Sequence, residues 1–447
     1  MKLPEYYTKI TVTLIENVRP FVLSAFIISC FFNSVEFPNP ITDLDRFELK
    51  PTMLTFPLLL ILAGIKIYQD GLGKYHFVLL WGVFVVSHFI SIFNSPALQT
   101  SLLQSILIMV MALVSIATAY SLSNRNELTL VFKIVGFFSV FFIAWQLGIY
   151  YTDLDYYGRL GGNEQILKGG PLYIGELLLI TTPFVFFFVS QKNIFIKFST
   201  LTATTLAICL TLSKGIILSF IFFQVLMFFM GKSKKQSLLV LSLTLLLFVL
   251  ATFGILDYPK QILNTPKTST ESPFLDYRKF NLYGQGNFSQ LETVLLNNST
   301  NKASFVHRFK AWAVALKSGL DKPLLGHGAG TSQQLIPALA HQFDYSSNER
   351  IQSLLRKYHA WGQNKTCCID AHNTFLTLFF EVGIFGALSL LIIIFIQFFQ
   401  VKLDSEIHVF LITLLAVISL HRLSINWSTI PNYYLVIGLS FSLFITK

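Results

Sequence analysis

The stretch DAHNTFLTLFFEVGIFGALSLLIIIFIQFF, residues 370–399, decides the fold class of this chain. From Asn373 onward it consists mainly of phenylalanine, leucine and isoleucine, with a single acid, Glu381. A helix of roughly 20 mostly apolar residues crosses the hydrocarbon core of a bilayer. The stretch therefore predicts a membrane-spanning helix, with His372 at its entrance.

The composition of the whole chain agrees with that interpretation. Hydrophobic residues make up 53% of the 447 residues and charged residues only 13%, whereas a soluble domain averages about 25% charged residues. The four cysteines offer no CxxC or Cys/His ligand spacing, and Cys367 and Cys368 are adjacent, so we expect no metal site.

Apolar runs of membrane-spanning length recur along the chain and predict an all-α polytopic membrane protein of about twelve helices. The seventh and eighth runs are separated only by Ser213, Lys214 and Gly215, which leaves a count of eleven open. The expected spans are residues 19–35, 53–68, 75–93, 100–122, 130–151, 172–190, 194–212, 215–230, 237–256, 373–399, 407–421 and 430–446.

The basic residues predict the orientation, because cytoplasmic loops of membrane proteins carry an excess of lysine and arginine. With the N-terminus inside, the cytoplasmic side holds fourteen: Lys2, Lys9, Arg19, Lys66, Lys74, Arg125, Lys133, Lys192, Lys197, Lys232, Lys234, Lys235, Lys402 and Lys447. The short outer loops hold six: Arg46, Lys50, Arg159, Lys168, Lys214 and Arg422. The start of the 373–399 helix then lies outside the cytoplasm.

A polar segment, residues 257–371, separates the first nine spans (1–256) from the last three (372–447), and we expect it to be a mostly helical outer domain. It carries thirteen lysines and arginines against eight acids, a net positive charge of five. This excess suggests an anionic ligand, although a generic basic face near anionic lipid would also explain it. Helical periodicity predicts helices within residues 304–319 and 346–362.

His372 is a candidate general base, with Asp370 placed to orient its ring; the alternative is a histidine that only caps the helix. If the helix is continuous, a turn of ~100° per residue puts Gly383 and Gly386 on the face of His372, where a neighbouring helix could approach closely. Glu381 lies on the opposite face, and we expect it to be a buried acid paired with another helix.

Three cations are predicted on the same outer side as His372. Lys214 lies between two apolar runs, Arg308 precedes Trp312 by four residues, and Arg159 lies in the short loop before residue 172. Each alone has an ordinary explanation, such as a lysine reaching toward the interface. The glycines at 326, 328 and 330 could expose backbone N–H groups to an anion, as a weak signal.

Two motifs resemble those of the bacterial O-antigen ligases and polymerases. His372-Asn373, nine residues, Gly383, two residues and Gly386 resemble the H-N-x9-G-x-x-G signature of the ligases. The stretch from Arg308 through Trp312 to the glycines of PLLGHGAG, residues 323–330, resembles a loop motif shared by ligases and polymerases. The resemblance implies a GT-C-like membrane fold with one large periplasmic loop.

The resemblance also implies an activity. Family members transfer a glycan from an undecaprenyl-diphosphate carrier to an acceptor hydroxyl without a metal, which here makes His372 the catalytic residue and Arg308 a pyrophosphate-binding residue. Lys214 stands where the family usually has the arginine of Ser-Arg-Gly, so the charge is kept and the bidentate fork is lost. Arg159 is a looser match, and Asp370, Asn373, Gly383 and Gly386 are supporting residues.

Within this family we favour the ligase, with lipid A–core as acceptor in lipopolysaccharide biosynthesis. The alternatives are an O-antigen polymerase, with a second lipid-linked repeat unit as acceptor, and a protein O-oligosaccharyltransferase. A flippase for lipid-linked sugars is the rival from another class, but it should have two similar halves. We expect a multi-pass protein of the bacterial inner membrane with a periplasmic active site, no cofactor and no nucleic-acid partner.

Overall fold

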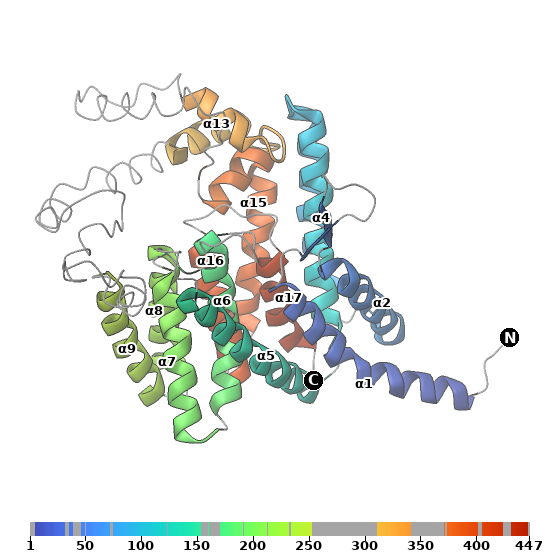
Figure 1. Ribbon diagram of the computed structural model, residues 1–447. Coiled ribbons are helices and arrows are strands. Elements are labelled where there is room, and N and C mark those ends of the chain that lie inside the picture. Colours follow the sequence, from blue (N-terminus) through green and yellow to red (C-terminus); the bar gives the residue numbers. More distant parts are fainter. Residues whose placement is uncertain are drawn as a thin grey trace, which may run out of the picture.

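In the computed structural model, twelve helices coincide with the twelve expected apolar runs (Figure 1). The residues that the structure describes are 5–31, 35–38, 46–49, 51–71, 75–122, 124–152, 160, 170–190, 192–211, 213–231, 234–252, 311–340, 371, 373–400, 405–422 and 431–445. The twelve helices are α1 (Glu5–Ser29), α2 (Thr52–Asp70), α3 (Tyr75–Ser91), α4 (Leu98–Tyr120), α5 (Arg125–Thr152), α6 (Gly170–Ser190), α7 (Ile194–Leu210), α8 (Lys214–Met230), α9 (Lys234–Thr252), α15 (Thr374–Gln400), α16 (Glu406–His421) and α17 (Pro431–Ile445).

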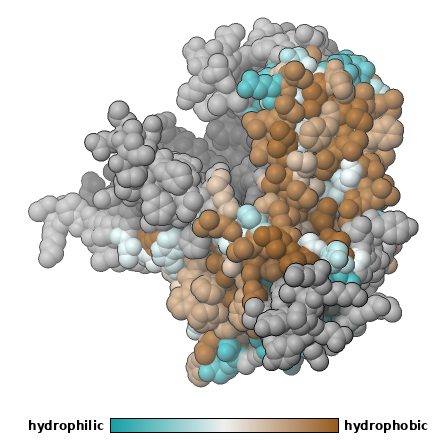
Figure 2. Space-filling view, turned by 90° about the vertical axis from the view of Figure 1, so that its right-hand side faces the viewer, coloured by the Kyte–Doolittle hydropathy of each residue, from teal (hydrophilic) through white to brown (hydrophobic). Residues whose placement is uncertain are grey.

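Seven of these helices, among the described residues, are long and apolar enough to cross a membrane: α2, α3 with the short η1 (Ile92–Asn94), α4, α5, α6, α9 and α15. The other five are shorter apolar helices. Figure 2 shows a broad hydrophobic face on the side where Figure 1 places α2 and α4. The exposed side chains of α2 and α4 include Leu58, Leu103 and Ile106, which suits contact with lipid tails. The class expected from the sequence, an all-α polytopic membrane protein, is confirmed.

The seventh and eighth runs form two separate helices rather than one long helix, so the expected runs correspond to twelve helices among the described residues. The α7 helix ends at Leu210 and α8 begins at Lys214. Between them, the Thr211 N–H donates to the carbonyl of Ile208, and the Thr211 hydroxyl donates to the same carbonyl. The hydroxyl therefore provides a hydrogen bond to a carbonyl of the last turn of α7 and helps to end the helix there.

Three features of the fold were not predicted. The α1 helix begins at Glu5, well before the expected start at residue 19. A two-stranded antiparallel ribbon, β1 (Val35–Pro38) with β2 (Arg46–Leu49), follows α1, with Val35 opposite Leu49. The α13 helix (Ser332–Ala340) lies in the 257–371 segment and contains Pro337, a residue that argues against an internal helical position.

The 257–371 segment is described in part. Residues 311–321 are helical, which agrees with the second half of the helix expected over 304–319. The helix expected over 346–362 lies outside the described residues. The division into a loop domain flanked by nine and three helices therefore remains a prediction.

The α6 helix forms the centre of the bundle. In its apolar span, Tyr173–Ser190, 89% of the residues are buried, against 56% or less in the other six candidate spans. Figure 1 places α7, α8 and α9 on one side and α2 and α4 on the other, with α6, α16 and α17 between them. A polar group on α6 is therefore surrounded by other helices rather than by lipid.

Helix ends that the charge pattern assigns to one side of the membrane contact one another. The Tyr173 hydroxyl at the start of α6 donates to the carbonyl of Cys30, just after α1, at 3.0 Å. The N–H of Leu160, in the loop between α5 and α6, donates to the carbonyl of Leu210 at the end of α7, at 2.9 Å. The alternating helix directions therefore agree with the charge pattern.

The remaining ends join the same set of contacts. The Thr374 N–H at the start of α15 donates to the carbonyl of Arg422, just after α16, at 2.9 Å. The Ala329 N–H, in the segment before α13, donates to the hydroxyl of Ser91 at the end of α3, at 3.1 Å. Which side of the membrane these ends face stays a prediction from the charges.

Candidate active site

Four of the eight predicted site residues lie outside the described residues, and Lys214 is described only through its backbone. Lys214 is the first residue of α8. Asn373, Gly383 and Gly386 are described with their contacts. The four outside are His372, Arg308, Arg159 and Asp370. The site is therefore built from the described neighbours of these residues.

The backbone is held on both sides of position 372. On one side, the indole N–H of Trp312 donates to the carbonyl of Ala371 at 2.6 Å. On the other, the Thr374 N–H donates to the carbonyl of Arg422 at 2.9 Å. Because Trp312 belongs to the helical residues 311–321, the loop helix that follows Arg308 is bonded directly to the entrance of α15.

Asn373 is the N-cap of α15. Its side-chain Oδ1 accepts hydrogen bonds from the backbone N–H groups of Phe375 and Leu376, both at 3.1 Å. These two donors have no partner within the first turn of a helix, and an asparagine cap of this kind contributes about 1 kcal/mol. The amide next to His372 in the motif thus fixes the direction in which α15 starts.

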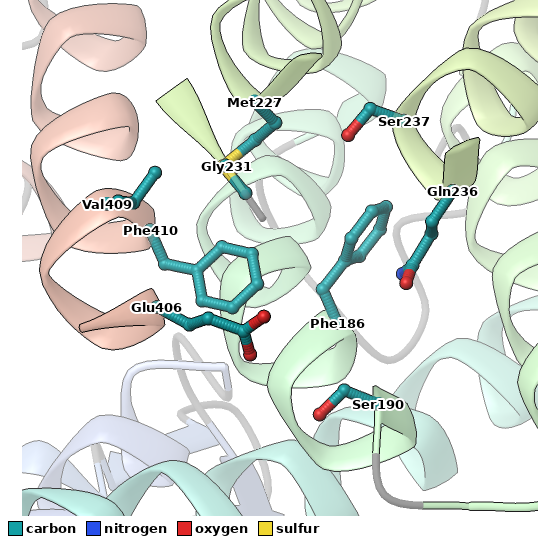
Figure 3. Close-up of a pocket in the computed structure, with 9 residues that line it drawn as sticks. All are labelled: Phe186, Ser190, Met227, Gly231, Gln236, Ser237, Glu406, Val409 and Phe410. Carbon is teal, nitrogen blue, oxygen red and sulfur yellow. The ribbon is translucent and has the colours of Figure 1, made fainter. Parts of the chain in front are cut away.

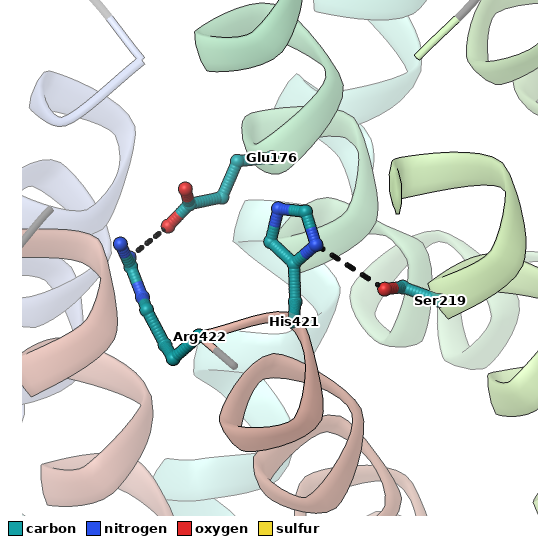
Figure 4. Close-up of polar contacts among 4 residues, drawn as sticks. All are labelled: Glu176, Ser219, His421 and Arg422. Atoms are coloured by element: carbon teal, nitrogen blue, oxygen red, sulfur yellow. Dashed lines mark hydrogen bonds and ion pairs between the residues drawn. The ribbon is translucent and has the colours of Figure 1, made fainter. Parts of the chain in front are cut away.

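A buried ion pair lies beside the entrance of α15. The guanidinium of Arg422 donates to the carboxylate of Glu176 on α6, and both side chains are 0% exposed (Figure 4). The guanidinium carbon of Arg422 lies 5.0 Å from the centroid of the Tyr433 ring on α17. The side chain of Arg422 therefore connects the end of α16 to α6 and α17. The backbone carbonyl of the same residue binds Thr374 at the start of α15.

Sequence reasoning missed this pair. Arg422 was counted only as one of six cations of the short outer loops, and Glu176 was not singled out. A signal was present, because Glu176 is the only acid in the apolar run 172–190, and an ionisable residue inside a membrane segment is a functional candidate by default. Its partner could not be chosen from the sequence.

A second polar contact connects this region to α8. His421 Nδ1 and Ser219 Oγ lie 3.4 Å apart, with His421 directly before Arg422 (Figure 4). Ser219 is five residues after Lys214 on α8, about one and a half helical turns. The elements that carry Lys214 and the start of α15 are therefore connected through the end of α16.

The segment that carries Arg159 is also attached near the start of α8. Leu160, the next residue, donates its N–H to the carbonyl of Leu210, and Leu210 is separated from Lys214 by only three residues. The described neighbours of the three cations and of His372 thus belong to elements joined by hydrogen bonds at connected helix ends. The prediction that these four residues act together is untested, and this arrangement is compatible with it.

The α15 helix is interrupted at Gly383, where φ is 71° and ψ is −169°. The 323–331 segment fills the interruption: the Ile384 N–H donates to the carbonyl of Pro323, and the N–H groups of His327 and Gly328 donate to the carbonyls of Phe380 and Glu381, all at 2.8 Å. We call this set of contacts, between residues 323–331 and 380–384, the backbone clamp. The clamp gives hydrogen-bond partners to backbone groups that lose their helical partners where α15 is broken.

The clamp corrects the expectation of a continuous helix. The rotation of ~100° per residue does not continue through Gly383, so the shared face of His372, Gly383 and Gly386 does not follow. Gly383 approaches a loop rather than a helix, since a Cβ there would overlap the carbonyl of Leu324. Gly386 does allow a close helix contact, because its Cβ would lie 2.9 Å from the Ser87 hydroxyl of α3.

The clamp also corrects the expectation of free amides for an anion. The N–H groups of His327 and Gly328 bind carbonyls of α15, and the Ala329 N–H binds the Ser91 hydroxyl. These three amides of the GHGAG run are used within the protein. A Cβ at Gly326 would overlap the backbone of Glu381, and a Cβ at Gly328 would overlap Ser95, so these glycines serve close packing.

Glu381 is confirmed as a buried acid paired with another helix. Its side chain is 4% exposed, and its Oε1 accepts from the N–H of Ser332, the first residue of α13, at 3.1 Å. A carboxylate at a helix N-terminus satisfies a free donor and complements the helix dipole. Glu381 therefore attaches α13 to α15.

His327 lies inside the clamp, outside the membrane-spanning helices. Its ring stacks on Phe380 with 4.6 Å between centroids, and its Nε2 lies 2.8 Å from the carbonyl of Ser318. Burial lowers the pKa of His327 below the usual value, partly offset by the Ser318 hydrogen bond. A neutral ring that donates to Ser318 fits this position.

One pocket lies at the ends of α6 and α16 that are opposite to the Glu176–Arg422 pair (Figure 3). Phe186 and Ser190 line it from the end of α6, and Glu406 lines it from the start of α16. Phe186 is ten residues from Glu176, about 15 Å along the helix, so the pocket is separate from the candidate site. Within the described ranges, no group of three or more His, Cys, Asp or Glu residues could hold a metal ion.

Comparison with protein families places part of this chain beside a known family. Residues 199–391 match the family model described as O-Antigen ligase, a stretch that runs from α7 into α15 and contains Lys214, Arg308, His372, Gly383 and Gly386. No curated protein matches the chain. The match supports the membership of this chain in the superfamily of O-antigen ligases and polymerases, without distinguishing the two.

Proposed function

We propose that this chain is a membrane glycosyltransferase that moves a glycan from undecaprenyl diphosphate to an acceptor hydroxyl, and that it is an O-antigen ligase acting on lipid A–core. The observation that carries the proposal is the family match over residues 199–391, within which Ala371 and Thr374, on either side of position 372, are both held by hydrogen bonds. The proposed location is the inner membrane with the site facing the periplasm.

In the proposed reaction, His372 accepts the proton of the acceptor hydroxyl while the acceptor oxygen attacks the anomeric carbon of the glycan. The bond between that carbon and the diphosphate oxygen breaks, and its electron pair leaves with undecaprenyl diphosphate. Arg308, Lys214 and Arg159 stabilise the negative charge that develops on the leaving group. His372 then releases its proton to water, and Asp370 orients the ring between turnovers.

A test uses purified protein in detergent with a lipid-linked glycan and one acceptor at a time. Removing a general base costs about a hundredfold to ten-thousandfold in rate, so we expect His372→Ala to lower transfer by at least about a hundredfold. Arg308→Ala should weaken transfer because it removes a pyrophosphate contact. A chelator should leave the rate unchanged if fixed cations do the work of a metal.

Matched controls separate a local role from general damage. His76→Ala removes an exposed histidine at the start of α3, and Lys317→Ala removes an exposed cation from the same loop helix that follows Arg308. Both controls should transfer like the wild type. Undiminished transfer by His372→Ala and Arg308→Ala would refute the proposed roles. Transfer to a lipid-linked repeat unit instead of lipid A–core would identify a polymerase, and translocation without transfer a flippase.

A further inference from the structure

We infer that Glu176 and Arg422 are a positioning pair that sets the entrance of α15, and with it the catalytic histidine, relative to the rest of the site. This inference rests on the proposed function. It adds two residues to the reaction that lie far from the signature motifs and that do not touch the substrate.

Arg422 makes two connections with two different parts of one residue. Its guanidinium binds the carboxylate of Glu176 on α6. Its backbone carbonyl accepts the N–H of Thr374, the first residue of α15, at 2.9 Å. A displacement of Arg422 is therefore transmitted directly to a residue two positions after His372.

The surroundings leave Arg422 little freedom. Both charged side chains are 0% exposed, and the guanidinium faces the Tyr433 ring at 5.0 Å. Its backbone N–H donates to the carbonyl of Ile418, so the residue continues the last turn of α16. The side chain, the carbonyl and the N–H thus connect Arg422 to four helices, α6, α17, α15 and α16.

Stability alone does not explain why charges occupy this place. A buried ion pair can often be replaced by packed apolar residues without loss of stability, because desolvation cancels much of the attraction. A carboxylate that binds a planar guanidinium does fix direction, which an apolar contact does not. We therefore assign the pair a role in fixing the position of Arg422 rather than in stabilising the fold.

The same burial argues that Arg422 is not a fourth cation for the pyrophosphate. Its charge is already bound to Glu176, and neither side chain is exposed. A diphosphate could reach Arg422 only by separating the pair inside the protein. This distinguishes Arg422 from Lys214, Arg308 and Arg159, which are proposed to contact the leaving group.

The test compares Glu176→Gln, Arg422→Gln, Arg422→Lys and the double variant Glu176→Gln/Arg422→Gln. Purified proteins are assayed for kcat and for KM of the lipid-linked donor, with thermal unfolding followed in parallel and rates expressed per folded protein. Glu127→Gln, which removes an acid near the start of α5, serves as the matched control and should behave like the wild type.

Misplacement of a catalytic group by about 1 Å can cost a hundredfold in rate. We expect kcat to fall by about ten- to a hundredfold in both glutamine variants, with donor KM unchanged within about twofold. Arg422→Lys, which keeps the charge, should retain more kcat than Arg422→Gln. In the double variant the unfolding temperature should recover, because no single charge is left buried, whereas kcat should stay low.

An unchanged kcat per folded protein in the glutamine variants would overturn the inference, as would recovery of kcat together with stability in the double variant. A raised donor KM with normal kcat would overturn it too, because it would indicate substrate binding. If the glutamine variants do not fold, the same criteria are applied to Arg422→Lys. His372→Ala is measured alongside: transfer retained there refutes the proposed function, whereas transfer lost there and normal in the pair variants refutes only the positioning role.

Discussion

The α15 helix is held at two places in two different ways. At its middle, the backbone clamp binds residues 380–384 to the 323–331 segment through main-chain hydrogen bonds and contacts at glycine. At its entrance, the carbonyl of Arg422 holds Thr374, and Arg422 is itself held by the charge of Glu176. The clamp depends on the absence of side chains, whereas the entrance depends on the presence of two opposite charges.

The two places should therefore tolerate different substitutions. Backbone contacts of this closeness leave no room for a Cβ, and they do not change with the charge of a side chain. The stability of the entrance should survive the replacement of both charges by neutral side chains of similar size, but not the loss of one charge, since an unpaired buried charge is costly. Substitutions at the clamp and at the entrance should therefore differ in the size of their effects.

The largest effect is expected from Gly383→Ala. The new Cβ would overlap the Leu324 carbonyl, and its φ of 71° is one that residues with a side chain rarely adopt. Together, the overlap and the positive φ should lower the free energy of unfolding by on the order of 4 kcal/mol or more, at the upper end of single substitutions. The unfolding temperature of purified protein in detergent measures the loss.

A matched control for this substitution is Gly64→Ala on α2, where a Cβ would meet no described atom within 4 Å. It should be neutral or slightly stabilising, as alanine is in a helix. If Gly383→Ala unfolds at the same temperature as Gly64→Ala, the clamp does not depend on a bare backbone and the comparison fails.

An intermediate effect is expected at Glu381, where a side chain supports the clamp. Glu381→Leu removes the acceptor of the Ser332 N–H and should cost about 1–3 kcal/mol, because a buried donor is left without its partner. Glu381→Gln keeps an oxygen acceptor and should cost less. Unfolding temperature gives the loss of stability in each variant, and the rate of proteolysis within α13 reports local opening. Equal losses of stability in the two variants would contradict a capping role for the carboxylate.

The smallest effect is a pH dependence that comes from His327. Burial keeps the pKa of His327 in the folded protein below 6.5, the usual value, so the unfolded chain binds the proton more readily. The contribution of the neutral His327 ring to the stability of the protein is therefore fully present above about pH 6.5, and it is lost as the pH falls through the lowered pKa.

Unfolding temperatures measured from pH 8 down to about pH 5 check this. The wild type should lose stability on acidification more steeply than His327→Gln, which cannot titrate in this range. Parallel curves for the two proteins would show that His327 carries no such linkage, and the clamp would then be as insensitive to protonation as its backbone contacts suggest.

Much of the fold could be predicted because membrane helices are marked locally. Each apolar run has to form its own backbone hydrogen bonds in lipid, so the twelve helices and most of their ends followed from hydropathy. The early start of α1 and the α13 helix did not, because polar or proline-containing helical turns carry no such mark. The site motifs around His372 and Arg308 were visible as patterns, while their arrangement depended on residues elsewhere.

Residues that are neighbours along the chain were enough to specify the class of this protein, the positions of its apolar helices and the likeness to O-antigen ligases. The pairing of residues that lie far apart along the chain followed from packing alone. Glu176 and Arg422 are 246 positions apart, and a buried charge can take any opposite charge that packing brings within reach. The break at Gly383 was decided in the same way, because the groups that satisfy it belong to residues 323–331, and only packing places them there.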